Sequence, residues 1–249
     1  MPGSIVAKGI YKGYSTRAGH LPVVDGIDLN VAEGEFVALV GPSGCGKSTL
    51  LDVLSGFEKP DRGEVLADGQ TVDGPSPKRI LIPQTTSVFP WLTSWRNLMF
   101  VKNGIPVEEQ MKRTAHYLEM VGLKEFQAAY PYELSGGMLK RLELARALSV
   151  KPHVLFMDEA FGSLDALTRL RLRNELLRLL SVERHTVLLV THDVEEAVHV
   201  ADRVVILTPR PTRIQRMVEV PFPHPRVLAS VELMKLKREI LKDLGVEFD

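Results

Sequence analysis

The sequence predicts an α/β fold with a mostly parallel core sheet, an antiparallel β layer and an inserted helical lobe. Five short apolar runs, most of them bounded by polar residues, have the length and composition of strands that are buried on both faces. Helical patterns lie between most of these runs, and such alternation is typical of a parallel sheet covered by helices. Residues 90–150 depart from the alternation, because their strand signals are weak and their periodicity is helical.

The individual core elements follow from these patterns. We expect core strands at residues 36–40, 79–82, 154–157, 186–190 and 203–207. We expect helices at residues 47–55, 166–180 and 195–201. In the second of these helices, one apolar stripe is expected to contain Leu167, Leu170, Leu177 and Leu180.

The remaining segments predict the parts outside the core sheet. The first 35 residues and residues 64–72 are expected to form the antiparallel β layer, with Asp68-Gly69 as a turn. Residues 107–121 and 138–148 are expected to be helices of the inserted lobe, and residues 226–244 a charged helix. We therefore expect one domain over residues 1–249. Its catalytic core would comprise residues 1–89 and 151–225, its helical lobe 90–150 and its C-terminal helix 226–249.

The composition excludes several classes of protein. Hydrophobic residues make up 45% of the 249 residues, which is ample for a core. The 31 basic and 31 acidic residues balance, so the basic excess of nucleic-acid-binding proteins is missing and we expect no nucleic-acid partner. No stretch approaches the roughly 18 apolar residues of a membrane span, and residues 1–20 contain no apolar signal core. The single cysteine, Cys45, permits no internal disulfide and suits a reducing compartment.

A phosphate-binding loop is the strongest motif. It fits G-x-x-x-x-G-K-[ST], follows an expected strand and opens an expected helix. Its glycines allow backbone N–H groups to face phosphate oxygens, Lys47 is expected to reach the β- and γ-phosphates, and Ser48 is expected to ligate Mg²⁺. A chance glycine turn is the alternative. The expected nucleotide-binding residues of the loop are Gly41, Pro42, Ser43, Gly44, Cys45, Gly46, Lys47, Ser48 and Thr49.

Two carboxylates end the apolar run at residues 154–157. A buried strand would deliver Asp158 and Glu159 to the carboxyl edge of the sheet, where ligands of such sheets bind. Asp158 suits the Mg²⁺ shell, and Glu159 suits a general base that activates water for attack on the γ-phosphate. Taken alone, the two acids could equally be solvated residues that cap the next helix.

The segment Leu134-Ser135-Gly136-Gly137-Met138 precedes an expected helix. Locally, Ser135 is an ordinary N-cap, but such a turn of small residues is also a site for anions. Between a phosphate loop and an acidic strand end, Leu-Ser-Gly-Gly resembles the signature of the ABC ATPases. The resemblance implies a P-loop NTPase core of the RecA-like type. It also implies that Ser135, Gly136 and Gly137 face the ATP held by a second subunit.

Further motifs extend the resemblance over nearly the whole chain. Gln84 matches the Q-loop glutamine, Asp165 in Ser163-Leu164-Asp165 matches the D-loop, and His192 matches the switch histidine. These matches imply catalytic roles for Gln84 and His192, with Gln84 also near Mg²⁺. Tyr14 falls where the family places an aromatic ring on adenine, and Tyr11 is the alternative.

A finer resemblance is to the nitrate, sulfonate and taurine importer ATPases. It rests on residues 89–97, 160–168, 193–197 and 221–226, parts of which sugar and polyamine importers share. Met138 stands where the family usually has Gln, and Ala160 where it usually has Pro. Neither touches a phosphate ligand, so we expect activity to be kept and coupling or rate to be altered.

The resemblance implies an ATP- and Mg²⁺-dependent ATPase subunit of an importer for a small anion such as nitrate, sulfonate or taurine. The expected partners are a second copy of the chain, transmembrane permease subunits and, indirectly, a solute-binding protein. The chain is expected to lie at the cytoplasmic face of the membrane. Its helical lobe, with Trp91 and Trp95 nearby, is expected to contact the permease. Two alternative functions remain. One is a soluble nucleotide kinase or GTPase, against which the sequence contains no Asn-Lys-x-Asp guanine motif. The other is a non-transport ABC ATPase.

Overall fold

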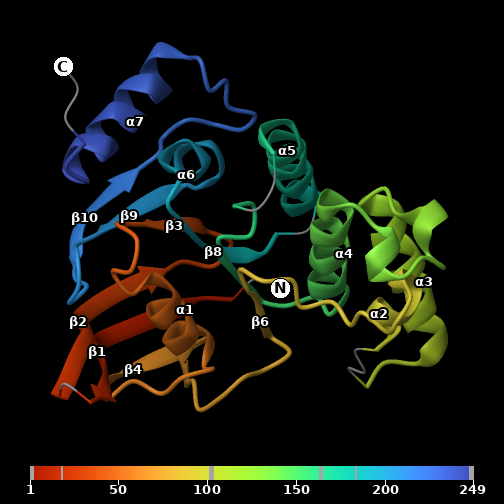
Figure 1. Cartoon of the computed structure of the whole chain (residues 1–249), viewed down its shortest axis with the longest axis horizontal. Helices are drawn as coiled ribbons and strands as arrows, with labels where there is room; N and C mark the ends of the chain where they lie inside the picture. Colours follow the sequence, from red (N-terminus) through yellow and green to blue (C-terminus); the bar gives the residue numbers. More distant parts are fainter. Residues whose placement is uncertain (1–2, 18, 101–103, 163–164, 183, 247–249) are drawn as a thin grey trace.

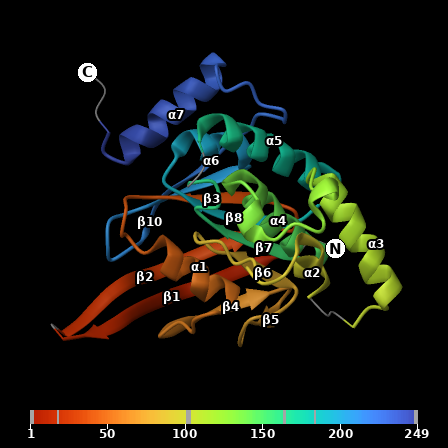
Figure 2. The ribbon, with the colours of Figure 1, turned by 45° about the vertical axis from the view of Figure 1, so that its right-hand side comes forward.

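The computed structural model describes residues 3–17, 19–100, 104–162, 165–182 and 184–246. Two sheets and the helices between and around them make up the fold (Figure 1). Figure 2 shows the layers: the four-stranded sheet at the bottom, helix α1 (Lys47–Ser55) above it, then the six-stranded sheet, with further helices on its far side. This is the P-loop NTPase arrangement that the sequence predicts.

The six-stranded sheet has the order β10-β9-β3-β8-β7-β6. All neighbours pair in parallel except β10, which lies antiparallel to β9 at one edge. The expected core strands are all present, and two of them extend one residue further than expected. The strands are β3 (Phe36–Val40), β6 (Arg79–Ile82), β7 (Val154–Asp158), β8 (Thr186–Thr191), β9 (Arg203–Leu207) and β10 (Ile214–Glu219).

The second sheet is antiparallel and has the order β2-β1-β4-β5. Its strands are β1 (Ile5–Thr16), β2 (Gly19–Val31), β4 (Arg62–Ala67) and β5 (Gln70–Thr71). Asp68 (φ 52°) and Gly69 (φ 74°) both adopt left-handed conformations between β4 and β5. Two such residues make the tight turn that joins antiparallel strands, as the sequence predicts.

Alternation along β3 divides the core into two clusters. Val37 and Leu39 face the cluster that contains α1 and the antiparallel sheet, whereas Phe36, Ala38 and Val40 face the other cluster. Because side chains of a strand alternate between its faces, a strand that is apolar throughout needs cover on both sides. The loop between β3 and α1 is therefore held between two packed layers.

In the described residues between β6 and β7, the chain forms five helical segments. They are α2 (Ser94–Met99), α3 (Val107–Met120), the short 3-10 turns η1 (Lys124–Phe126) and η2 (Pro131–Glu133), and α4 (Gly136–Ser149). Figure 1 shows α2, α3 and α4 grouped on one side of the molecule, away from α1. Helix α2 was not predicted, since its six residues are too few to show a helical period. The division of the chain into a core and a lobe stays a prediction.

The remaining helices cover the six-stranded sheet on the side opposite α1 (Figure 2). They are α5 (Ala166–Val182), α6 (Val194–Val200) and α7 (Val231–Asp243). The predicted apolar stripe of α5 is wrong in part. Half of it fails: Leu167 and Leu170 are exposed, whereas Leu177 and Leu180 are partly buried against the core, and the fully buried leucines are Leu172, Leu176 and Leu179. Leucines occur on every side of this helix, so the sequence pattern does not single out the buried face.

The C-terminal helix begins later than predicted. Its N-cap is Ser230, whose hydroxyl accepts a hydrogen bond from the Leu233 amide. Arg226, the predicted first residue, lies before the helix and is buried. Its guanidinium donates to the carbonyls of Val198 and Ala201 at the end of α6, at 2.9 and 2.6 Å. Within the described part of the chain, no helix combines the length and the apolar character of a membrane span.

Candidate active site

The loop between β3 and α1 has the conformation that its glycines permit. Gly44 and Gly46 have φ angles of 72° and 119°. Residues with a Cβ atom rarely adopt such a backbone conformation, whereas glycine does so readily. A Cβ on Gly46 would also lie 2.6 Å from Cγ1 of Val23. Cys45 is buried, and its carbonyl accepts a hydrogen bond from the Thr212 hydroxyl. The loop is therefore fixed from both sides in one tight turn.

Lys47 is the first residue of α1, and its side chain is buried. The Nζ atom donates to the carbonyls of Gly41 and Pro42, at 2.9 and 3.0 Å, so the ammonium group lies at the centre of the loop. The first turn of α1 contains no acidic residue, and no side chain caps it. Because unpaired N–H groups and the helix dipole favour an anion there, this turn suits a phosphate.

Asp158 ends β7 beside the start of α1. The Ser48 hydroxyl bonds to its carboxylate, and the Lys47 charge acts on it. Burial raises the pKa of Asp158, and the Glu159 charge adds to this, although Ser48 and Lys47 oppose the shift. Its Oδ1 atom is buried and, among the described residues, has no hydrogen-bond partner.

The Asp158 oxygen and the Ser48 hydroxyl are oxygen ligands of the kind that Mg²⁺ prefers. The described residues contain no group of three or more His, Cys, Asp or Glu side chains that could hold a metal by themselves. Mg²⁺ commonly takes only one or two protein ligands and completes its shell with phosphates and water. The residues at this strand end therefore fit Mg²⁺ as a partner of a nucleotide.

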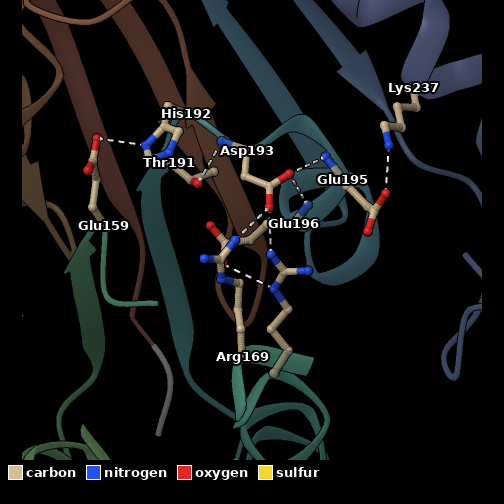
Figure 3. A network of polar contacts seen from close by, with 9 residues as sticks. Glu159, Arg169, Thr191, His192, Asp193, Glu195, Glu196 and Lys237 are labelled. Atoms are coloured by element: carbon tan, nitrogen blue, oxygen red, sulfur yellow. Dashed lines mark hydrogen bonds and ion pairs between the residues drawn. The ribbon is translucent and has the colours of Figure 1, made fainter. Parts of the chain in front are cut away.

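Glu159 brings three separate parts of the chain together. One carboxylate oxygen accepts a hydrogen bond from Gln84 Nε2 at 3.1 Å, and the other lies 3.2 Å from His192 Nδ1. Figure 3 shows the second contact. Glu159 has a left-handed backbone (φ 44°), and its N–H donates to the carbonyl of Val190 at 2.9 Å. A non-glycine residue in this conformation is strained, and such strain is concentrated at functional sites.

The turn around His192 is held by contacts that sequence reasoning missed. The Asp193 amide donates to the Thr191 hydroxyl, and the Asp193 carboxylate caps α6. The same carboxylate lies 2.8 Å from the guanidinium of Arg173 on α5, which also donates to Glu196 at 3.2 Å. In the sequence, this pairing is indicated only by a basic residue, Arg173, among the apolar residues of a helix. Because the predicted buried face of α5 was misplaced, Arg173 was not recognised as a buried residue.

Helix α4 is joined to the segment that carries Gln84. Lys140 is buried and donates to the carbonyl of Gln84 at 3.2 Å and to the carboxylate of Glu143 at 2.9 Å. Glu143 also accepts hydrogen bonds from the amide and hydroxyl of Ser87, both at 2.6 Å. The spacing of Lys140 and Glu143, three residues apart on one helix, was the available sequence signal.

Ser135 is the N-cap of α4, and its exposed hydroxyl accepts a hydrogen bond from the Met138 amide at 3.3 Å. Around Gly136 there is open space, whereas a Cβ on Gly137 would lie 2.6 Å from Cγ2 of Thr168 on α5. Helix α4 packs on α2, α3, α5 and β6, whereas α1 packs on the two sheets. The signature turn and the phosphate loop therefore belong to different parts of one chain (Figure 1).

Asp165 directly precedes α5, and Thr168 of this helix lies against Gly137 of the signature turn. Its carboxylate accepts a hydrogen bond from the Thr168 amide at 3.0 Å and so begins this helix. Ser163 and Leu164, the other two residues of the predicted D-loop, lie outside the described residues. The two residues that depart from the family pattern differ in burial. Ala160 is buried in the core, whereas Met138 is partly buried and packs against the core.

The structure places Tyr14 beside the phosphate loop. Its hydroxyl donates to Glu58 at 2.7 Å and lies 3.5 Å from the hydroxyl oxygen of Thr49, and burial raises its pKa. Lys12 Nζ lies 5.4 Å from the ring centroid. Tyr11 instead lies against Gly26, where an added Cβ would be 2.9 Å from the Tyr11 hydroxyl. Of the two candidates, Tyr14 is the one that contacts α1.

Comparison with known proteins gives a consistent family. The profile of the family described as ABC transporter matches residues 24–162. An uncharacterised ABC transporter ATP-binding protein of Methanocaldococcus jannaschii is 41% identical, over 99% of this chain and 93% of its own length. The nitrate import ATP-binding protein of Synechococcus elongatus is 44% identical over 88% and 82% of the two chains. The bicarbonate transport ATP-binding protein of the same species is 40% identical over 89% and 82%.

A solved structure agrees with these relatives. It is a dimeric ATP-binding cassette in a post-hydrolysis state, bound to ADP and Pi. The TM-score is 0.76 at 29% identity, and the match covers 88% of this chain and all of the other.

Proposed function

This chain belongs to the ABC transporter family and is an ATPase of that family, and on this premise we propose that it powers a membrane importer for a small anion. The single observation that carries the proposed catalytic site is the position of Glu159. Its carboxylate lies between Gln84 and His192, next to the Asp158–Ser48 pair at the start of α1.

Each residue of this site has a proposed role. Lys47 and the N–H groups of residues 41–49 bind the phosphates of ATP. Glu159 accepts the proton of the attacking water, while Gln84 orients that water and His192 donates a hydrogen bond to the γ-phosphate. Tyr14 stacks on the adenine. The products are ADP and inorganic phosphate, and the proton taken by Glu159 is released to solvent afterwards.

Ser48 and Asp158 are proposed to hold Mg²⁺, with Gln84 close to it. Bound there, the ion would neutralise charge on the β- and γ-phosphates. The orphaned, buried Oδ1 atom of Asp158 supports this assignment, because a buried carboxylate oxygen without a partner is costly unless a ligand or ion satisfies it.

A second copy of the chain is proposed to complete the site. The signature residues Ser135, Gly136 and Gly137, with Asp165 nearby, would face the nucleotide of the partner copy. The packing of α4 on α2, α3 and α5, on the side of the molecule away from α1, supports this (Figure 1). The dimeric state of the similar solved cassette supports it as well.

The proposed permease contact lies beside α4. A cavity of about 420 Å³ is lined by Phe57, Phe89 and Phe100 together with Ser87, Glu143 and Arg146. Trp91, close by, is 69% exposed, whereas Trp95 packs against the core. Exposed aromatic residues beside a hollow are typical of interfaces.

A chain in this role would work at the cytoplasmic face of the membrane, and a solute-binding protein would deliver the anion to the permease. The anion itself is proposed from the relatives named for nitrate and bicarbonate import.

Reconstitution tests this proposal. The chain, a permease that co-purifies with it and the matching solute-binding protein would be combined in vesicles with ATP inside or outside, and uptake of labelled nitrate, bicarbonate and an alkanesulfonate would be measured. We expect ATP-dependent uptake of one anion, and none with Glu159→Gln. Full ATPase activity without any membrane partner, together with co-purification in a soluble complex, would instead favour a non-transport ABC ATPase.

A further inference from the structure

We propose that Arg173 is a positioning residue for His192: it fixes the turn that holds this imidazole against Glu159. The inference rests on the proposed catalytic roles of Glu159 and His192. It assigns a role in the reaction to a residue of α5 that does not itself contact the nucleotide-binding loop in any described interaction.

The side chain of His192 has little support of its own. It is 59% exposed, and its described contact is that of Nδ1 with Glu159, at 3.2 Å. Because an exposed imidazole can take several rotamers, this contact depends on where the backbone presents the ring. The backbone on either side of His192 therefore determines how often the two groups meet.

On one side of His192 the backbone is fixed by the sheet. Thr191 is buried and is the last residue of β8, which lies in the middle of the six-stranded sheet. On the other side stands Asp193, whose amide donates to the Thr191 hydroxyl at 3.0 Å. This bond closes a short turn around His192. Thr191 holds one end of the turn in the sheet, and Asp193 forms the other end, outside the sheet.

Arg173 fixes that end. Its Nη2 atom lies 2.8 Å from Asp193 Oδ2, while Asp193 Oδ1 accepts hydrogen bonds from the amides of Glu195 and Glu196 at 2.9 and 3.2 Å. Burial acts to raise the pKa of Asp193, but Arg173 and the two amides outweigh it and lower the pKa. Asp193 is therefore ionised and held on both oxygens.

Arg173 also has the setting of a rigid anchor. It is only 3% exposed and bonds to two carboxylates, through Nη2 to Asp193 and through Nε to Glu196 at 3.2 Å. The planar guanidinium presents its donors in a fixed fork, so two carboxylates on one turn of α6 are held at a defined angle. A lysine would keep the charge but lose this fork.

Kinetics of Arg173→Gln test the proposal. We expect kcat for ATP hydrolysis to fall roughly tenfold or more, while KM and ATP binding stay close to wild type, because the phosphate loop is unchanged. Arg173→Lys should recover part of kcat. Arg216→Gln is the control: Arg216 also faces two carboxylates, Asp243 at 2.9 Å and Glu239 at 4.0 Å, but it is exposed and lies on the edge strand β10, three strands away from β8. It should keep wild-type kcat.

A double-mutant cycle separates positioning from mere stability. If Arg173 acts through His192, then Arg173→Gln should cost little further activity in a His192→Ala background. Equal costs in both backgrounds would overturn the proposal, as would wild-type kcat in Arg173→Gln. If His192→Ala itself had wild-type activity, the proposed function of His192 would fail instead.

Folding of the single variant need not limit the test. The double variant Arg173→Met, Glu196→Met replaces both partners of the buried pair by apolar side chains, which proteins often tolerate. It removes the 2.8 Å contact of Arg173 with Asp193, leaves Asp193 its two amide hydrogen bonds and the longer 3.7 Å contact with Arg169, and leaves no lone buried charge in the pair. We expect it to unfold at a similar temperature to wild type and to show the same loss of kcat. A folded double variant with wild-type kcat would contradict the proposal.

Discussion

Glu159 shows how one residue can join the parts of the proposed site. Its φ of 44° costs on the order of 1 kcal/mol, and the bond from its N–H to Val190 holds the residue in that conformation. In return, the carboxylate meets both Gln84 and His192. The neighbouring Asp158 suits a separate task, since its carboxylate bonds to the Ser48 hydroxyl and lies within the influence of the Lys47 charge.

Glu159→Gln is expected to keep ATP binding and to lower hydrolysis by roughly 100-fold or more, because an amide cannot accept the proton of the attacking water. Turnover of ATP by the purified variant, with binding followed by fluorescence, measures this. Since bound ATP would persist, light scattering should show more dimer than in wild type. Normal turnover would move the general base to another residue.

Lys47→Ala is expected to abolish turnover and to weaken ATP binding, because the buried ammonium is the cation at the centre of the phosphate loop. Titration with ATP and with ADP measures the loss. Lys124→Ala is the control, since Lys124 is an exposed residue paired with Glu119 on the surface. Unchanged ATP affinity in Lys47→Ala would refute the assignment of the loop.

Helix α4 is the element that joins the parts of the site. Its first residues form the signature turn, and its buried face carries the Lys140–Glu143 pair that binds the segment from Gln84 to Ser87. A rigid shift of α4 would therefore move Gln84 with it. Arg146 extends the connection, because it donates to the Ser87 hydroxyl and stacks on Phe89 beside the cavity.

The stability of this pair can be measured by urea unfolding. Lys140→Met is expected to destabilise the protein by roughly 3 kcal/mol, because it leaves the Glu143 carboxylate buried without its 2.9 Å partner. The double variant Lys140→Met, Glu143→Leu is expected to lose less, since neither charge remains. A double variant less stable than the single one would show that the pair does not act as a unit.

Elements were predictable from the sequence where one local pattern decides them. The apolar runs give the core strands, and the pattern Gly-Lys-Ser after one of them gives the phosphate loop. The apolar face of α5 and the start of α7 were not predictable, because leucines surround α5 and Arg226 pairs with α6 rather than continuing a helix. The motifs likewise supply Glu159 and His192. Their supporting partners, Arg173 and Lys140, come from distant helices and leave no local pattern.

At the scale of the whole molecule, a buried histidine links stability to pH. His199 on α6 is 3% exposed. Burial lowers its pKa to about 4, and the nearby charges of Arg173, His224 and Arg226 add to this. An unfolded chain binds the proton below about pH 6.5, whereas the folded chain does so only near pH 4. Stability from this group is complete above about pH 6.5 and is lost as the pH falls towards 4.

His199→Leu is therefore expected to show a smaller loss of stability on acidification than wild type. The difference between the two proteins should reach up to roughly 3 kcal/mol between pH 7 and pH 4, from the size of the pKa shift. Urea unfolding at pH 7, 6, 5 and 4 gives both curves. Because Glu196 and Asp158 have raised pKa values and act in the opposite sense, only this difference isolates His199. Parallel curves would refute the expectation.

Arg226 connects the site with the order in which the chain is synthesised. The guanidinium of Arg226 donates hydrogen bonds to the last carbonyls of α6. During synthesis, Arg226 leaves the ribosome only after the whole of α6 has done so. Until then, a nascent chain carries every nucleotide-binding motif, but the helix that follows His192 lacks the partner at its far end. The far end of α6 thus gains its partner late in translation, so a chain truncated before residue 226 is expected to unfold at a lower urea concentration than the full chain even though its motifs are whole.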